Sequence, residues 1–142
     1  METSDDVFFR EFGGTCTELR QAFARHVSMS APRLHLLMRL HRDGETSHRS
    51  LGRALSLDGA TVTRLVKEFE AEGLTTRRVD PSDNRFTLAR LTPHGERVTA
   101  DLDESHQAYQ ARLLKDVSAQ DRETVLRVLA TLRAGIEAEA AR

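Results

Sequence analysis

Residues 47–91 constrain the fold more than any other segment, because two short helical patterns and a basic hairpin pattern follow one another there without a long loop. Thr46 and Ser47 are good helix-capping types, since a side-chain oxygen can accept a hydrogen bond from a free N–H of the first turn. Beyond them, Leu51, Ala54 and Leu55 are three and four residues apart. This spacing predicts a helix of about two turns with one apolar face.

A second amphipathic helix is predicted after the tight connection at residues 56–57. Asp58 can cap this helix, and its negative charge suits the positive end of the helix dipole. Gly73 follows the helix and can take the left-handed conformation that is common there. Four apolar residues with helical spacing are expected to face inward: Val62, Leu65, Val66 and Phe69. The residues left mainly on the outer side are Thr61, Thr63, Arg64, Lys67 and Glu68.

The segment after this helix predicts a basic β-hairpin. Residues 74–79 and 85–91 contain β-favouring types in partial polar and apolar alternation, and residues 80–84 are turn-forming. The arginines of the hairpin are Arg77, Arg78, Arg85 and Arg90. A polar helix face alone is typical of any solvated helix. The order helix, helix, basic hairpin is much more specific, and it predicts a winged helix-turn-helix that binds duplex DNA.

The charge distribution agrees with this prediction. The net charge of the 142 residues is −1, so the chain is not a generally basic nucleic-acid binder. Residues 31–97 nevertheless hold twelve Lys and Arg against nine Asp and Glu, while residues 98–142 hold six against eight. Positive charge therefore concentrates where phosphate contacts would supply affinity.

The flanking segments are predicted to be helical and to form a dimer interface. Residues 7–27 carry apolar residues at steps of three and four, and residues 31–41 predict a helix that buries Leu34, Leu37, Met38 and Leu40. Thr92 and Pro93 can begin a long helix, and Ser118 can cap a last helix with an apolar stripe. The stripe consists of Val125, Leu129, Leu132 and Ile136. Because such faces are too apolar to remain exposed, we expect packing against a second copy rather than folding back on the same chain.

The central segment closely resembles the MarR family of bacterial transcription regulators. The matching runs are LGRALSLDGATVTRLV at residues 51–66, FEAEGL at 69–74, RRVDPSDNR at 77–85 and LTPHG at 91–95. The Asp-x-Arg wing signature of the family is present as Asp83-Asn84-Arg85. The resemblance implies a mostly α fold with a small β-hairpin wing. It also implies a two-fold homodimer held by the terminal helices.

On this basis, residues 1–142 are expected to form a single MarR-like domain. Residues 31–92 would be its winged helix-turn-helix, and residues 6–29 and 93–142 its helical dimerisation part. A two-fold dimer predicts a pseudo-palindromic operator with half-sites about one helical turn (~34 Å) apart. The expected function is that of a ligand-responsive regulator, most simply a repressor.

Each candidate DNA-binding residue can be given an expected role. Arg64 is the candidate for base recognition, because arginine can make a bidentate contact to guanine. Thr63 can reach bases or phosphates, and Thr61 and Lys67 are assigned to phosphate. The resemblance implies that Arg85 enters the minor groove. Asp83 cannot favourably contact phosphate, so it is expected to orient Arg85 or a nearby arginine. Arg77 and Arg78 alternate across a strand, so one of them is expected to face DNA. Arg49 and Arg53 are further phosphate candidates.

A ligand pocket between the dimer helices and the winged part is the arrangement that the resemblance implies. An arginine or histidine among apolar side chains would suit a small phenolic carboxylate. The candidates by position are Arg20, Phe23, His26, Pro32, His35 and Met38. The alternative is that His26 and His35 are merely hydrogen-bonded residues near the interface. DNA binding without any effector is also open.

Cys16 raises the alternative of a thiol-based redox-sensing regulator. A reactive thiol needs nearby positive charge or donors that lower its pKa, whereas Cys16 lies on an apolar stripe with Phe12, Leu19 and Phe23. The sequence therefore favours a buried small apolar role. The six histidines show no HxxxH or HxH spacing, so no metal site and no cofactor are predicted.

Other classes of protein are less consistent with the sequence. It contains no Gly-rich phosphate loop, nucleophile elbow, HExxH or CxxC, which argues against an enzyme. A dimeric interaction module that does not bind DNA is the more serious alternative, although it would not need arginine at both Arg64 and Arg85. The acidic start and the lack of a long apolar run predict a cytoplasmic protein that does not associate with membranes.

Overall fold

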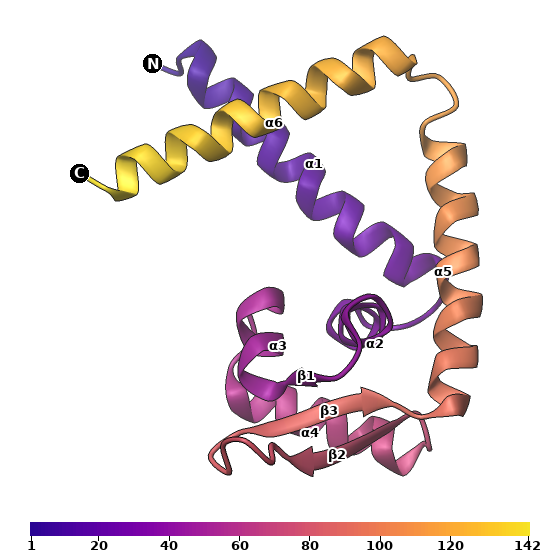
Figure 1. Cartoon of the computed structure of the whole chain (residues 1–142). Coiled ribbons are helices and arrows are strands. Elements are labelled where there is room, and N and C mark those ends of the chain that lie inside the picture. Colours follow the sequence, from indigo (N-terminus) through magenta and orange to yellow (C-terminus); the bar gives the residue numbers. More distant parts are fainter. The chain divides into compact units, whose positions relative to one another are not determined.

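The computed structural model describes residues 1–142 as six helices and three strands (Figure 1). The chain divides into two compact units, residues 1–106 and 107–142. The helices are α1 (Ser4–His26), α2 (Ala31–Asp43), α3 (His48–Leu55), α4 (Gly59–Ala71), α5 (Pro93–Leu113) and α6 (Ala119–Ala140). The strands are β1 (Thr46–Ser47), β2 (Thr75–Val79) and β3 (Thr87–Leu91). The predicted fold class, mostly helical with a small β wing, is confirmed.

Polar side chains cap the helices where the sequence predicted caps. Ser47 accepts a hydrogen bond from the backbone N–H of Ser50 at the start of α3, and Asp58 accepts one from Thr61 at the start of α4, at 2.7 Å. Ser118 caps α6 in the same way. Helix α1 begins three residues earlier than predicted, because Thr3 and Asp6 form a reciprocal capping box.

A three-stranded antiparallel sheet has the order β1-β3-β2. Thr46 was predicted to be a capping residue, but it lies in β1 and pairs with Ala89. The sequence missed β1 because two residues are too few to show an alternating pattern. Strand β3 starts at Thr87 rather than at Arg85. The side chain of Asp83 accepts from the backbone N–H of Arg85, which keeps that residue in the turn.

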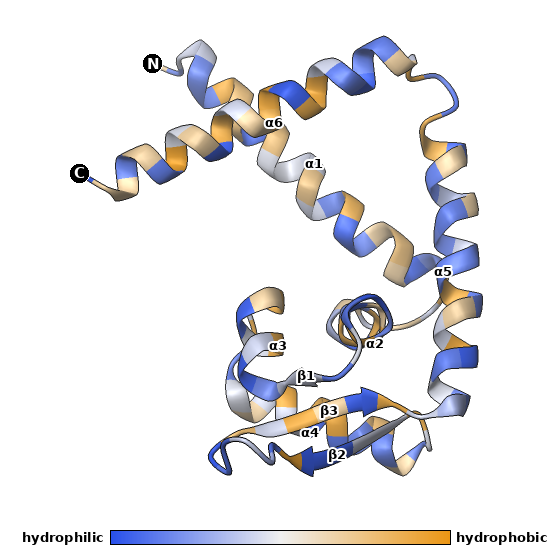
Figure 2. Cartoon of the chain, in the orientation of Figure 1, coloured by the Kyte–Doolittle hydropathy of each residue, from blue (hydrophilic) through white to orange (hydrophobic).

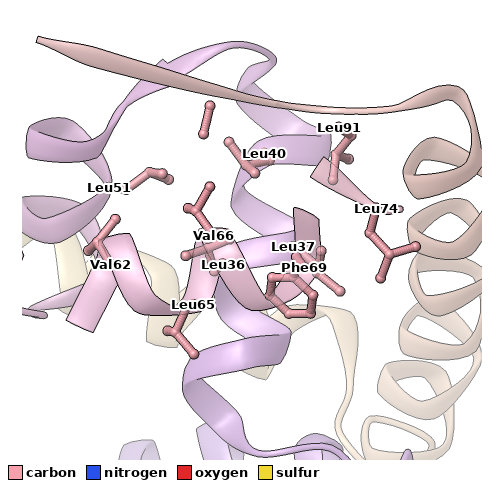
Figure 3. Packing of buried hydrophobic residues seen from close by; sticks show 11 residues of the cluster. Leu36, Leu37, Leu40, Leu51, Val62, Leu65, Val66, Phe69, Leu74 and Leu91 are labelled. Atoms are coloured by element: carbon pink, nitrogen blue, oxygen red, sulfur yellow. The ribbon is translucent and has the colours of Figure 1, made fainter. Parts of the chain in front are cut away.

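The core of the first unit lies between α2, α3, α4 and the sheet (Figure 3). All four residues of α4 that were predicted to face inward are buried. In α2 the prediction was partly wrong, since Met38 is only half-buried and Leu36 is fully buried instead. The reason is that α1, α3 and β3 all contact α2, so its buried face is wider than a single stripe.

Two glycines join α4 and the sheet to α5. Gly73 has a φ of 77° just beyond α4, in the left-handed region that glycine enters without steric cost. Gly95 lies so close to the carbonyl of Leu74 that a Cβ at this position would clash with it. The N–H of Thr92 also donates to the carbonyl of Leu74, at 2.9 Å. Together these contacts hold the base of the wing against the first turn of α5.

The terminal helices bury far less than the central ones. Helix α6 buries no residue in the single chain, and α1 buries only Phe23 and Ala24. Apolar positions recur along both helices (Figure 2). Exposed large apolar residues include Val7, Phe8, Phe9 and Leu19 on α1 and Val125, Leu126, Val128 and Ile136 on α6. None of the helices has the length and apolar character required to cross a bilayer.

Candidate nucleic-acid interface

The outer face of α4 carries the four residues predicted for the recognition helix. Arg64 and Lys67 are exposed, whereas Thr61 and Thr63 are half-buried. This face is hollowed, and small residues among the charged ones leave room for close approach. The hollow is lined by Gly59, Ala60, Thr63, Arg64, Lys67, Glu68 and Ala71.

Glu68 holds Arg64 along the helix in the absence of DNA. Its Oε1 accepts from Nη1 of Arg64 at 3.0 Å, and its Oε2 accepts from Nη1 of Arg33 at 2.9 Å. Arg33 is itself fixed by Glu72 and lies over the ring of Phe69. An exposed ion pair contributes little net stability. The guanidinium of Arg64 can therefore exchange Glu68 for an acceptor on a base at small cost.

At the tip of the wing, Asp83 orients the side chain of Arg85. The Asp83 carboxylate accepts from Nε of Arg85 at 3.0 Å and from Nη2 at 2.7 Å. These bonds hold the pKa of Asp83 below its usual value and raise that of Arg85, so both groups are charged. The Arg85 side chain is 80% exposed and projects from the end of the hairpin. Among the wing arginines that form an ion pair, Arg85 has the most exposed side chain.

The two arginines of β2 are both held by carboxylates outside the sheet. Nε of Arg77 lies 3.0 Å from Glu70 at the end of α4, and Nη2 of Arg78 lies 2.7 Å from Glu45 before β1. The pairing raises the pKa of each arginine. These ion pairs connect β2 to the end of α4 and to the segment before β1. Arg77 and Arg78, which the sequence suggested only as DNA-binding residues, therefore also stabilise the wing.

A groove between α3, the start of α4 and the wing brings several predicted residues together. It gathers Arg49 and Arg53 of α3, Thr63 of α4 and Arg85 of the wing around one hollow. Its other lining residues are His48, Gly52, Leu57, Gly59, Phe86 and Thr87. Three arginines from two segments far apart in the sequence, α3 and the wing, thus share a surface with α4.

Phe86 and His48 are groove residues that the sequence analysis did not assign. The guanidinium of Arg49 lies 5.9 Å from the centre of the Phe86 ring, and that of Arg85 lies 5.8 Å from it, which is within cation–π range. Nδ1 of His48 lies 3.3 Å from Oγ1 of Thr63. From the sequence alone, Phe86 is predicted only to lie in a strand. Its position next to Arg85, directly after a polar turn, was the sequence signal that could have indicated a role at the wing.

The candidate ligand residues are only partly brought together. Phe23 is buried and stacks on His106, with ring centres 4.5 Å apart, and it also contacts His26 at 6.2 Å. Burial is the main cause that lowers the pKa of His35, which also hydrogen-bonds to the backbone of Arg20. The sequence analysis did not include His106 in this cluster. Pro32 is exposed in the first turn of α2, and Met38 is half-buried.

Cys16 is half-buried on α1 as a free thiol. Its role as a redox residue stays a prediction. No group of three or more histidine, cysteine, aspartate or glutamate side chains is arranged to hold a metal ion.

The fold and the charged groove define a winged helix-turn-helix DNA-binding protein, and comparisons with known proteins give its family. The MarR family model matches residues 29–87. The uncharacterized HTH-type transcriptional regulator YdgJ of Bacillus subtilis is 35% identical over 114 residues, covering 80% of this chain and 70% of YdgJ. The chain therefore belongs to the MarR family of DNA-binding transcriptional regulators, and it is not an enzyme.

Solved structures share the fold. A probable transcriptional regulator from Pseudomonas aeruginosa is 25% identical with a TM-score of 0.68, covering 85% of this chain and 93% of that chain. S. aureus MepR, crystallised as a DNA complex, is 20% identical with a TM-score of 0.70, covering 95% and 99%. MarR from E. coli in its apo form is 18% identical with a TM-score of 0.69, covering 93% and 97%. Membership of a DNA-binding family leaves the alternative of an interaction module without DNA unsupported.

Proposed function

We propose that this protein is a homodimeric repressor that binds a pseudo-palindromic operator and releases it when a small aromatic carboxylate binds. The observation that carries the DNA-binding part is the groove, which places Arg49, Arg53 and Arg85 beside Thr63 of α4. The arginines of the groove can contact the phosphates of a DNA backbone, and the exposed face of α4 can contact base edges.

The proposed roles follow from exposure and pairing. Arg64 recognises a base after leaving Glu68, because arginine forms the commonest bidentate contact to guanine. Arg85 enters the minor groove while Asp83 fixes its direction. Phosphate is contacted by Thr61, Lys67, Arg49 and Arg53. Arg77 and Arg78 chiefly brace the wing, since each is already paired with a glutamate.

The dimer is proposed from the exposed apolar residues of α1 and α6. Large side chains such as Phe9 and Ile136 are 58% and 67% exposed in the single chain. Covering them removes apolar surface from water at about 25 cal/mol per Å². In this proposal residues 6–29 and 93–142 form the dimerisation part, and residues 31–92 bind DNA. The two-fold axis sets half-sites about 34 Å apart.

The ligand is proposed to bind near Phe23. Phe23 stacks on His106 in an aromatic cluster, while Arg20 lies near His35 and carries the charge that would neutralise a carboxylate. His26, Pro32 and Met38 are the remaining candidate lining residues. A ligand that binds one separation of the winged parts better than another would shift the population away from the operator-binding form.

The test is capture of fragments from the genome that encodes this chain, followed by sequencing of what is retained. The full chain is compared with Arg64→Ala/Arg85→Ala and with the charge-matched control Arg42→Ala/Arg142→Ala, which removes two exposed arginines elsewhere. We expect an inverted repeat with the full chain and the control, and none with Arg64→Ala/Arg85→Ala. An inverted repeat that this variant retains would refute the proposed interface.

The ligand part is tested on the recovered operator with benzoate, salicylate and 4-hydroxybenzoate as probes. We expect at least one to weaken operator binding about tenfold or more, as a coupling of 1–3 kcal/mol implies. Arg20→Met should abolish that response and leave binding without a ligand unchanged. If no aromatic carboxylate changes the affinity, the ligand part is wrong and the operator part stands.

A further inference from the structure

The contact between His48 of α3 and Thr63 of α4 joins the two helices of the helix-turn-helix at the groove. The distance from Nδ1 of His48 to Oγ1 of Thr63 is 3.3 Å, and both residues line the groove that contains Arg85. The other ring nitrogen of His48, Nε2, is buried and has no hydrogen-bond partner. The direction of this one hydrogen bond therefore decides what the Thr63 hydroxyl can offer to DNA.

Thr63 differs from five other helical threonines in what its hydroxyl contacts. Five threonines in the helices donate to the carbonyl four residues earlier: Thr15, Thr17, Thr99, Thr124 and Thr131. The Thr63 hydroxyl contacts His48 instead. No bond from this hydroxyl to the backbone of its own helix accounts for its proton, so the tautomer of His48 decides where the proton goes.

His48 is neutral at neutral pH and carries a single ring proton. Burial, followed by the nearby charge of Arg77, lowers the pKa of His48 from its ordinary value. With one proton, the ring has two tautomers. If Thr63 donates to Nδ1, the ring proton must sit on Nε2, where it would be a buried donor without an acceptor. If Nδ1 carries the proton, it donates to Thr63 and leaves only a bare lone pair on Nε2.

The second tautomer costs less, because an orphaned buried N–H is rarer and more costly than an unsatisfied acceptor. We propose that His48 is a positioning residue: its Nδ1–H donates to Oγ1 of Thr63 and so leaves the Thr63 hydroxyl proton free to donate to DNA. This inference rests on the proposed place of Thr63 in the DNA interface.

The chemistry of the recognised group follows from the free proton. A donating hydroxyl selects an acceptor: N7 of a purine, O6 of guanine, O4 of thymine or a phosphate oxygen. In the opposite tautomer the hydroxyl could only accept, and it would select the amino group of cytosine or adenine. His48 would thereby help decide, through Thr63, which base edges α4 prefers.

The tautomer is tested directly on the full, unmodified chain. Long-range ¹H–¹⁵N NMR distinguishes a protonated ring nitrogen from a bare one. We expect Nδ1 of His48 to be protonated and Nε2 to be bare at pH 7.5. A proton on Nε2 overturns the proposal whatever the variants do.

The functional test is a double-mutant cycle with Thr63→Val, which removes the hydroxyl at constant shape, and His48→Phe, which keeps a ring without nitrogens. We expect each single change to weaken operator binding about tenfold, and the double variant to bind no worse than either single variant. His48→Asn places an amide donor where Nδ1 stands, and it should recover most of the affinity. Thermal unfolding of each variant shows whether it is folded at the assay temperature.

Operators with single base-pair changes separate the two sources of the acceptor. If Thr63 contacts a base, Thr63→Val should lower the affinity only for operators that carry the preferred base pair at one position, and that base pair should present an acceptor to Thr63. A phosphate contact predicts a uniform loss across sequences. If the His48→Phe loss is the same with and without the Thr63 hydroxyl, the two residues are not coupled and the proposal fails. If Thr63→Val has no effect but Arg64→Ala/Arg85→Ala still abolishes binding, this inference fails and the proposed function stands.

Discussion

Helices α4 and α6 are both amphipathic, but they differ in how much of their apolar face is buried in the single chain. Both begin with a polar side chain that caps the first turn, Asp58 and Ser118. Helix α4 buries four residues in 13, whereas α6 buries none in 22. An apolar stripe thus indicates that a helix must be covered, but it does not say which chain covers it. The predictions below use this difference, from the largest expected effect to the smallest.

The largest effect on stability is expected at the buried face of α4. Phe69 is fully buried in the core, so Phe69→Ala should lower the free energy of unfolding by about 3–5 kcal/mol. The loss should not depend on protein concentration, because the contacts lie within one chain. Denaturant titration at two protein concentrations measures it. A loss that disappears at high concentration would mean that Phe69 also stabilises the dimer.

The second largest effect is expected on the apolar stripe of α6, and it should be a loss of association. Val125→Asp/Ile136→Asp places two charges on side chains that are 52% and 67% exposed in the single chain. We expect the dimer dissociation constant to rise roughly 30-fold or more, the effect of losing one strong interface anchor. Sedimentation equilibrium measures this change.

The matched control on α6 is Ala130→Asp/Ala134→Asp, which adds the same charge to exposed positions away from the stripe. It should leave the dimer intact. Equal dissociation by both variants would show that the net charge of the helix matters, and that the apolar stripe is not the contact.

The outer faces of the two helices should differ in DNA binding. Arg64→Ala should weaken operator binding roughly tenfold and relax the preference at one base pair, because a bidentate contact is lost. Arg127→Ala on α6 removes the same charge from an exposed position and should change operator affinity little. Fluorescence anisotropy with operator variants measures both. Similar losses in the two variants would point to non-specific charge and away from base recognition by α4.

The smallest expected effect is a pH dependence of the free energy of unfolding, which we expect to arise from histidines in the first unit. Its only two histidines with a resolved shift, His35 and His48, have a lowered pKa, mainly because of burial, and residues 107–142 contain no histidine. Near the ordinary pKa of about 6.5 the unfolded chain therefore binds more protons than the folded chain. The stabilising contribution is present above that pH and is lost progressively as the pH falls below it.

Denaturant midpoints at pH 7.5 and 5.5 test this sign, since carboxylates with a lowered pKa, such as Asp58 and Asp83, titrate below this window. His35→Asn/His48→Asn should reduce the difference between the two midpoints. The single variants divide the effect between the two sites. A midpoint that rises on acidification would contradict the burial argument.

Much of the fold could be predicted because the signals were local. The caps at Ser47 and Asp58, the turn at Gly73 and the inward face of α4 each depend on residues within one or two helical turns. What could not be predicted depends on distant partners. Leu36 is buried because three elements surround α2, and β1 exists only because β3 offers it backbone partners.

The same division holds for the candidate site. The sequence supplied Arg64, Arg85 and the other basic residues, because charge and pattern are visible in the residue types themselves. It could not show that Phe86 lies within cation–π range of Arg49 as well as of Arg85, since Arg49 and Phe86 come from segments that only folding brings together. The sequence did suggest that Asp83 orients Arg85, but it did not show that Glu68 holds Arg64.

By itself the sequence determined the order and type of the helices, the wing, the family resemblance and the basic residues that are proposed to meet DNA. Periodicity, capping and turn chemistry act over a few residues, so they can be recognised without knowing the fold. Only the tertiary structure decided that glutamates pair with Arg64, Arg77 and Arg78, that Arg49 lies near the ring of Phe86, and that His48 contacts Thr63. Those contacts depend on distances between side chains far apart along the chain, and packing sets such distances.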